Sequence, residues 1–224
     1  MPRRRHRHPP PSSPSPAPAA VDLPAVIESP PSDVVALPPV DITRAQAIRG
    51  WMSAAELTWL ARTAQSAAAV IEIGCYLGRA TRALGDHVAG TVFSIDPWSG
   101  AYFNDDDSVA RWFRKLGQSG DDLFAQFSAN LADLIAAGAV VPIRAPAAEA
   151  VAQVPASVDV VFIDGDHRYE AIRQDLATYR VRVRPGGILA GHDYGRADWP
   201  GVQRAVDEAF PAVTVVDTIW WVRL

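Results

Sequence analysis

Short apolar runs alternate with amphipathic segments from residue 41 onward. Five runs of five or six residues, rich in Val, Ile or Ala, predict buried strands. They are AVIEIG (69–74), TVFSID (91–96), AVVPI (139–143), VDVVFI (158–163) and GGILAG (186–191). Between them, apolar residues recur every three or four positions and predict helices at 53–65, 79–88, 121–138, after residue 167 and at 201–210. This alternation predicts an α/β fold with a mostly parallel sheet covered on both faces.

The C-terminal segment AVTVVDTIWWVRL (212–224) breaks this alternation. It reads as two strands joined by a tight turn around Asp217, with no room for a helix between them. Two strands joined in this way must pair antiparallel. We therefore predict a Rossmann-like, doubly wound sheet of seven strands that is mostly parallel and ends in an antiparallel β-hairpin.

The first 40 residues have a different composition from the rest of the chain. They contain 12 of the 19 prolines and none of the 15 glycines. Because proline lacks a backbone N–H and fixes φ, this stretch cannot form a helix or the interior of a sheet. We predict a disordered, basic, Pro-rich tail at 1–40, followed by one domain at 41–224. A solvated extension with no specific role is favoured over a tail that binds a partner.

Charge and composition narrow the range of partners. The formal net charge is −4, but four arginines in the first 20 residues contribute +4, so the rest of the chain carries −8. An acidic domain argues against nucleic acid as the main partner. No run approaches the roughly 18 apolar residues that a membrane span needs. The single cysteine fits a reducing compartment, and no apolar segment follows the basic N-terminus. We expect a cytoplasmic protein that acts on a small molecule; a homo-oligomer is left open.

The loop after the first predicted strand carries Glu72, Gly74 and Gly78. In a doubly wound sheet a nucleotide-like ligand binds here, because glycine lets the backbone approach and the next helix begins with free N–H groups. The spacing E-x-G-x-x-x-G lacks the G-x-G-x-x-G of dinucleotide sites and the G-K-[ST] of phosphate loops. Asp96 follows 22 residues after Gly74, where an acid can accept hydrogen bonds from a ribose diol. The alternative for Asp96 is a cap or turn residue before Pro97.

Three segments carry a family resemblance: EIGCYLGRATRAL, SIDPW and FIDGDHRYEAIRQDLATYRVRVRPGGILAGHDY. They resemble class I S-adenosylmethionine-dependent methyltransferases, and more narrowly the small O-methyltransferase-like branch related to macrocin and other sugar O-methyltransferases. The similarity covers about residues 50–224. It implies S-adenosylmethionine as cofactor, with its methionine part on the glycine loop, its ribose at the acid after the second strand and its adenine beside the loop after the third. The cofactor-binding residues implied are Glu72, Gly74, Cys75 (through its backbone), Gly78, Asp96, Ala147, Ala148 and Asp164.

Acidic residues and histidines follow the fourth and fifth predicted strands. Asp164 and Asp166 follow the fourth, and His192 and Asp193 follow the fifth. Parallel neighbours lie about 4.8 Å apart, so Asp164 and Asp193 can converge on one point. Two carboxylates with bound waters suit Mg²⁺, which would lower the pKa of a substrate hydroxyl for attack on the sulfonium methyl group.

The third protein ligand of such an ion is left open. This arrangement resembles that of metal-dependent O-methyltransferases of the catechol type. In those enzymes the set of metal ligands ends in an Asp-Asn pair, whereas here Tyr194 follows Asp193. Asp166 or His192 could substitute, and a histidine would shift the preference towards Mn²⁺. Without a metal, Asp164 would hydrogen-bond to the cofactor or substrate and Asp193 would cap a loop.

Asp166, His167 and His192 are the candidates for the catalytic base. In the sugar-methylating relatives the second Asp of DGD is the proposed base, which indicates Asp166, and a histidine with a pKa of about 6.5 can also accept a hydroxyl proton. The alternative is that Asp166 and His167 only begin the next helix. Residues 97–120 are placed to form a lid over the substrate, with a solvated loop as the alternative.

These features predict a metal-assisted transfer of a methyl group from S-adenosylmethionine to a hydroxyl of a small acceptor, such as a sugar or natural product. A catalytically degenerate methyltransferase fold that only binds ligands or partners is one alternative. A nicotinamide-dependent oxidoreductase is another, weakened by the missing G-x-G-x-x-G.

Overall fold

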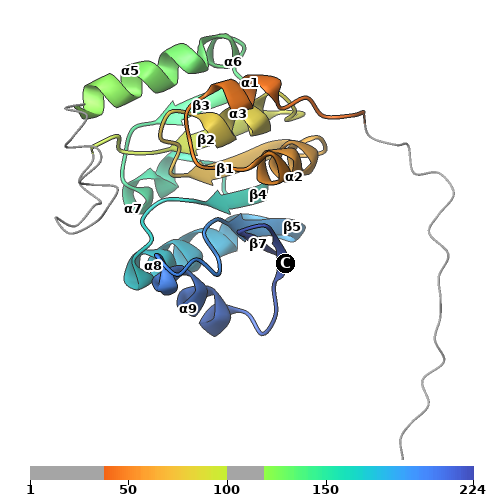
Figure 1. Cartoon of the computed structure of the whole chain (residues 1–224), viewed down its shortest axis with the longest axis vertical. Coiled ribbons are helices and arrows are strands. Elements are labelled where there is room, and N and C mark those ends of the chain that lie inside the picture. Colours follow the sequence, from red (N-terminus) through yellow and green to blue (C-terminus); the bar gives the residue numbers. More distant parts are fainter. Residues whose placement is uncertain (1–37, 100–118) are drawn as a thin grey trace, which may run out of the picture. The chain divides into compact units, whose positions relative to one another are not determined.

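The computed structural model describes residues 38–99 and 119–224. In this part of the chain, seven strands form one sheet in the order β3-β2-β1-β4-β5-β7-β6 (Figure 1). The strands are β1 (Ala69–Ile73), β2 (Thr91–Ile95), β3 (Val140–Ile143), β4 (Val158–Ile163), β5 (Val183–Gly191), β6 (Thr214–Val216) and β7 (Ile219–Arg223). β1 to β5 pair in parallel, and β7 is antiparallel to both β5 and β6. The predicted fold class, with its C-terminal hairpin, is confirmed.

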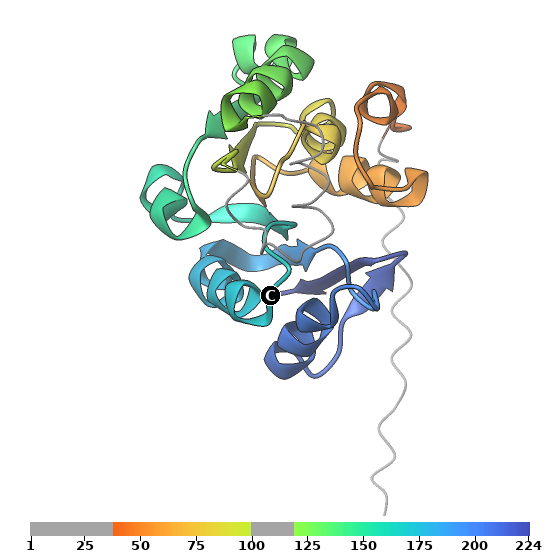
Figure 2. The same ribbon diagram turned by 60° about the vertical axis from the view of Figure 1, so that its left-hand side comes forward.

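Helices cover both faces of this sheet (Figures 1 and 2). The described helices are α1 (Thr43–Ala47), α2 (Ala54–Ala64), α3 (Arg79–Gly85), α5 (Gly120–Asn130), α6 (Ala132–Ala136), α7 (Ala147–Ala150), α8 (Tyr169–Tyr179) and α9 (Pro200–Ala209), with short 3₁₀ turns at Val151–Gln153 and Arg180–Arg182. α1, α2, α3 and α5 contribute to one buried apolar cluster, and α7, α8 and α9 contribute to a second. The sheet therefore lies between two apolar layers.

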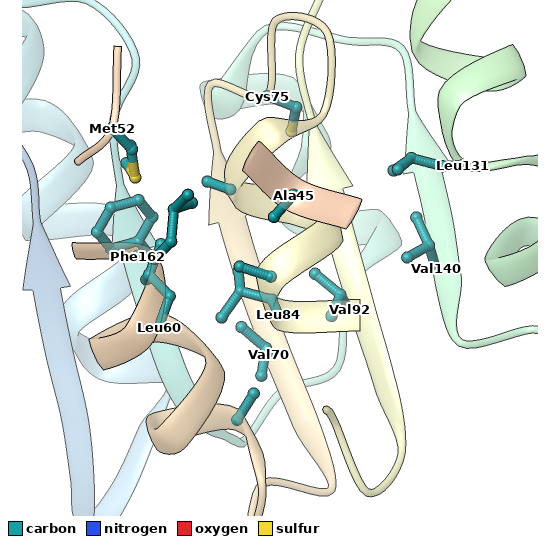
Figure 3. Close-up of a cluster of buried hydrophobic side chains, with 14 of the residues drawn as sticks. Ala45, Met52, Leu60, Val70, Cys75, Leu84, Val92, Leu131, Val140 and Phe162 are labelled. Atoms are coloured by element: carbon teal, nitrogen blue, oxygen red, sulfur yellow. The ribbon is translucent and has the colours of Figure 1, made fainter. Parts of the chain in front are cut away.

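The first cluster shows how alternation along a strand produces these layers. Leu60 of α2 and Leu84 of α3 are fully buried, and both belong to the same cluster as Val70 of β1 (Figure 3). Ile71, the next residue along β1, belongs to the cluster on the opposite face. Full burial of a Leu or Ile side chain contributes about 1.5–3 kcal/mol, so both faces stabilise the sheet.

Local sequence accounts for some helix boundaries and not for others. Ser53 and Glu56 form a capping box at the start of α2, because Ser53 Oγ accepts from the Glu56 N–H at 3.2 Å and Glu56 Oε2 accepts from the Ser53 N–H at 2.8 Å. The single helix predicted at 121–138 is wrong: α5 and α6 are separated at Leu131, which has φ −117° and ψ 14°. This break lets the buried Leu131 side chain pack beside Gly78.

Two predictions lie largely outside the described residues. They are the Pro-rich tail as far as residue 37 and the substrate lid between residues 100 and 118, and both stay predictions. Across 38–99 and 119–224, every helix is too short or too polar to span a bilayer.

Candidate active site

Four strands of the sheet end side by side and bring the predicted site residues together. Ile73 of β1 pairs with Ile95 of β2 and with Ile163 of β4, and Ile163 pairs with Gly191 of β5. The residues that follow these strands therefore share the carboxyl edge of the sheet, where open α/β sheets bind ligands. They line a cavity of about 490 Å³.

Most of the predicted site residues are on the wall of this cavity. Those that line it are Gly74, Cys75, Asp96, Ala147, Ala148, Asp164, Asp166, His167, His192 and Asp193. Glu72 and Gly78 do not line it. Gly78 is instead the N-cap of α3, with φ +89°, a conformation that glycine adopts without a steric cost.

The loop after β1 is held by its own backbone and by Asp96. Gly74 has φ +84°, and a Cβ at this position would overlap the carbonyl oxygen of Asp164. Asp96 Oδ2 accepts from the N–H groups of Cys75 at 2.9 Å and Tyr76 at 3.0 Å, and Oδ1 accepts from the Trp98 N–H at 2.6 Å. Burial raises the pKa of Asp96 against the lowering effect of these three donors. Asp96 therefore fixes the loop and also faces the cavity.

Glu72 lies beneath this loop and is fully buried. Its Oε2 accepts from the Thr81 hydroxyl at 2.6 Å and from the Ser94 hydroxyl at 3.2 Å, while Oε1 has no partner among the described residues. Burial raises its pKa to about 8, against the lowering effect of these hydrogen bonds. At neutral pH Glu72 is therefore mostly uncharged, and it supports the loop from behind.

The clearest candidate cation site joins the ends of β4 and β5. Asp164, His167 and Asp193 each offer one ligand atom, and these three atoms lie within 4.8 Å of one another. His167 Nε2 is 2.8 Å from Asp193 Oδ2, and the His167 ring stacks on Trp199 with 4.4 Å between ring centroids. Asp193 has φ +61°, a conformation that few residues besides Gly, Asn and Asp adopt. His167 is thus a third potential ligand, and the predicted alternatives Asp166 and His192 stay predictions.

His192 lies between carboxylates on both sides of its ring. Nε2 is 3.1 Å from Glu56 Oε1, and Nδ1 is 3.2 Å from Asp164 Oδ1 and 3.4 Å from Asp193 Oδ2. Burial lowers the pKa of His192, but the carboxylates outweigh it and raise the value to about 12. The ring is therefore held as an imidazolium, which positions the two aspartates and cannot accept a substrate proton in this form.

Glu56 of α2 anchors His192 at the ring nitrogen that does not face the aspartates. Its Oε1 also accepts from the Thr218 N–H at 3.1 Å and the Thr218 hydroxyl at 2.7 Å. Burial raises the pKa of Glu56, but the hydrogen bonds from His192, Thr218 and Ser53 lower it to about 2. The capping-box residue of α2 is thus also part of the site.

Asp166 is engaged by a neighbour in sequence. Its Oδ1 accepts from the Arg168 N–H at 2.9 Å, and both of its oxygens accept from the Arg168 guanidinium. It therefore shapes the turn before α8, whose N-cap is Arg168. The predicted role of Asp166 as a base stays a prediction.

Sequence reasoning missed several residues of this cavity. Arg79 donates to the carbonyl oxygens of Gln46 at 3.0 Å, Ile48 at 2.7 Å and Met52 at 3.1 Å, which holds the loop that carries Trp51 onto the cavity wall. Asp175, Arg196 and Trp199 on the cavity wall were also missed. So was Glu56, which holds His192 without lining the cavity. Only Asp175 left a signal in the sequence: it is a carboxylate beside Leu176, on the apolar face of its helix.

The structure is similar to several solved methyltransferases. CalS11, a calicheamicin methyltransferase, superposes with a TM-score of 0.55 at 17% identity over 75% of this chain and 76% of its own. An O-methyltransferase from Bacillus cereus in complex with SAH gives 0.54 at 16% identity, over 82% and 87% of the two chains. TomG, an O-methyltransferase from Streptomyces achromogenes in complex with SAM, gives 0.53 at 16% identity, over 76% and 80%. At these identities the likeness shows the fold.

The sequence comparisons give one short match and one family. An uncharacterised protein, R132, of Acanthamoeba polyphaga mimivirus is 38% identical over 55 residues, which are 24% of this chain and 25% of that protein. The family described as a methyltransferase domain matches residues 71–194, more than half of the chain. The predicted resemblance to S-adenosylmethionine-dependent methyltransferases is confirmed, and the chain belongs to the methyltransferase domain family.

Proposed function

We propose that this chain transfers the methyl group of S-adenosylmethionine to a hydroxyl oxygen of a small acceptor, with a divalent cation held by Asp164, His167 and Asp193. The observation that carries the proposal is the single cavity that the glycine loop, Asp96 and the cluster after β4 and β5 share. The family assignment supports methyl transfer, and two structures of the same fold are described as O-methyltransferases with SAM or SAH bound.

The cofactor would lie across the ends of β1, β2 and β3. Gly74 and the backbone of Cys75 would face its methionine part, and Ala147 and Ala148 would face its adenine. An ionised carboxylate has about four acceptor positions, and Asp96 uses three of them for backbone N–H groups, two on Oδ2 and one on Oδ1. The remaining position, on Oδ1, would accept one ribose hydroxyl, so Asp96 would position the loop and the cofactor together.

The cluster of Asp164, His167 and Asp193 fits a divalent cation by its chemistry. Two carboxylates and one imidazole suit Mn²⁺ or a similar transition metal better than Mg²⁺, which prefers oxygen ligands. Such an ion, when bound, would lower the pKa of a substrate hydroxyl. His192 lies against both aspartates and would offset part of their charge, and Glu56 holds the other nitrogen of its ring.

The protein's own groups would align the reactants and receive the proton. Methyl transfer needs the acceptor oxygen, the methyl carbon and the leaving sulfur in line, and fixing this geometry is itself a large part of catalysis. With the cation bound, Asp166 is the group on the cavity wall that would accept the hydroxyl proton. His167 would accept it only without the cation, because a neutral imidazole has one available nitrogen lone pair. Trp51 and Trp199 would present apolar ring faces to the acceptor.

The acceptor class is proposed from the surroundings of the site. The domain is acidic overall, which disfavours nucleic acid, and CalS11 is described as a TDP-rhamnose 3'-O-methyltransferase. We therefore place sugars and hydroxylated natural products first. The cytoplasmic location stays a prediction.

One observation favours the alternative, a methyltransferase fold that binds without turnover. The His192 ring lies between Glu56 on one side and Asp164 and Asp193 on the other, and Asp166 is paired with Arg168, so two of the three candidate bases are engaged by protein groups. Under this alternative the chain binds cofactor and methylates no acceptor.

Calorimetry with S-adenosylhomocysteine tests the cofactor part of the proposal. The wild-type chain should bind, and Asp96→Ala should bind at least about 10-fold more weakly. Transfer of labelled methyl from S-adenosylmethionine to nucleotide sugars, glycosides and catechols, before and after EDTA treatment, tests the rest. Absence of binding would overturn the proposal. Binding without transfer to any acceptor would support the alternative, a fold that binds without turnover. Transfer that survives EDTA treatment would show that the reaction needs no divalent cation.

A further inference from the structure

Asp175 on α8 is a buried acid on the cavity wall that has no hydrogen-bond or ion-pair partner among the described residues. Its residue is 8% exposed, and it lines the cavity together with Ala171, one helical turn earlier. Within residues 38–99 and 119–224, no N–H or hydroxyl donates a hydrogen bond to its carboxyl group, and no cation pairs with it. Burial and the nearby charge of Asp166 raise its pKa to about 7. The proposed function as stated above gives this residue no role.

Other acids that are largely removed from solvent in this protein are supplied with donors. Asp159 accepts from the N–H groups of Ala68 at 2.8 Å and Ala69 at 3.0 Å, and from Arg184 Nε at 2.6 Å. Asp96 accepts from three backbone N–H groups. A buried carboxyl without a donor destabilises the fold, whereas a leucine at position 175 would extend the apolar face of α8. Because Asp175 has no donor among the described residues, we infer that its donor belongs to a ligand.

The position of Asp175 along α8 indicates which part of a ligand it meets. Tyr179, one turn further on, donates from its hydroxyl to the carbonyl oxygen of Ala147 at 2.6 Å, which fixes α8 against α7. Pro146, Ala147 and Ala148 line the same cavity as Asp175. Asp175 therefore belongs to the part of the wall where α7 and α8 meet.

We propose that Asp175 accepts a hydrogen bond from the 6-amino group of the cofactor's adenine and so selects adenine over other purines. The inference rests on the proposed function, which puts the adenine beside Ala147 and Ala148. On the base edge of adenine that pairs with other bases, the exocyclic amine is the donor and the ring nitrogens are acceptors. The ionised form of Asp175 is an acceptor only, and a donor on the ligand favours that form. The amine is therefore the group on this edge with which the carboxylate can pair.

The test compares two ligands on the full chain by calorimetry. They are S-adenosylhomocysteine and its analogue with hydrogen in place of the 6-amino group. The wild type should bind S-adenosylhomocysteine roughly 10-fold or more tightly than the analogue, because one charge-assisted hydrogen bond is lost. Asp175→Ala should bind both ligands with equal affinity, and Asp175→Asn should keep much of the preference because its amide oxygen also accepts. Glu170→Gln, on the exposed side of the same helix, is the matched control and should match the wild type.

Three results would overturn the inference. One is equal affinity of the wild type for the two ligands, a result that can be measured without any variant. Another is a preference that persists in Asp175→Ala. The third is a melting temperature of Asp175→Ala far below that of the wild type together with an equal loss of both ligands, which indicates a structural role. A wild type that binds neither ligand would overturn the proposed function and this inference together, whereas the first two results leave the proposed function standing.

Discussion

The two halves of the cavity are built in different ways. At the ends of β1 and β2, backbone N–H groups hold Asp96, and a glycine with positive φ lies against the chain of β4. At the ends of β4 and β5, side chains hold one another: His192 bridges Glu56 to the two aspartates, and His167 contacts Asp193. The first half is fixed by chain geometry and the second by charge.

This difference has a consequence for substitutions. Changes in the half built from backbone should affect folding and cofactor binding together, because the same atoms make the loop and the site. Changes in the half built from side chains should affect turnover more than cofactor binding, because the cofactor would lie mainly on the other half.

Gly74→Ala should have the largest effect on stability. An alanine here must adopt φ +84° and place its Cβ against the backbone of Asp164 and Gly165. We expect a loss of at least about 3 kcal/mol in the free energy of unfolding, with loss of S-adenosylhomocysteine binding. Urea denaturation and calorimetry measure the two effects. Gly138→Ala is the matched control, because Gly138 has φ +74° with open space around it and should cost only about 1 kcal/mol. Equal losses in the two variants would contradict the steric argument.

Asp193→Asn should separate turnover from cofactor binding. It removes one proposed cation ligand and the charge that faces His167 and His192. We expect a fall of roughly 100-fold in kcat, with S-adenosylhomocysteine binding within about threefold of the wild type. Asp217→Asn, in the turn between β6 and β7 with φ +56°, is the control and should leave both unchanged. If Asp193→Asn abolishes cofactor binding, the two halves are not separable.

Glu72→Gln should change how stability depends on pH. The pKa of Glu72 is raised to about 8 in the folded chain, so the folded state resists ionisation while the unfolded chain ionises near its ordinary value of 4.5. The wild type should therefore lose stability as the pH rises from about 4.5 to about 8, by up to about 5 kcal/mol from this group. Glu72→Gln should remove that part of the slope, while its amide oxygen can still accept from Thr81 and Ser94. Urea denaturation at pH 5 and pH 8 measures it; identical slopes in the two proteins would show that Glu72 ionises freely in the fold.

The half built from backbone is also the half that sequence predicts well. Gly74 and Asp96 are fixed by order along the chain: a strand, a glycine turn, a helix, then an acid 22 residues after the glycine. Both line the cavity as expected. Glu72 shows the limit of this reasoning, because the side to which a strand residue points decides whether it meets the ligand or the core. Its partners, Thr81 and Ser94, lie on the adjacent helix and strand.

The half built from side chains depends on partners that are distant in sequence. Glu56 lies 136 residues before His192, and in the sequence it shows only as the second member of a capping box. Nothing in LAGHDY indicates that His192 is charged, because its charge comes from Glu56 on one side and two aspartates on the other. Asp166 gives the converse case, since Arg168 is only two residues away but the direction of its side chain cannot be predicted from order alone.

Trp199→Leu should have the smallest effect and probes the side of His167 that no carboxylate faces. The rings of Trp199 and His167 stack with an angle of 22° between their planes, which restricts how His167 can turn away from Asp193. A stacked pair of this kind contributes about 0.5–1.5 kcal/mol beyond area burial, so kcat should fall by roughly 3- to 10-fold. Trp199→Phe keeps an aromatic face and should recover most of this loss. If charge alone holds His167, both variants will match the wild type in kcat and differ from it only in KM, through the apolar surface that Trp199 offers the acceptor.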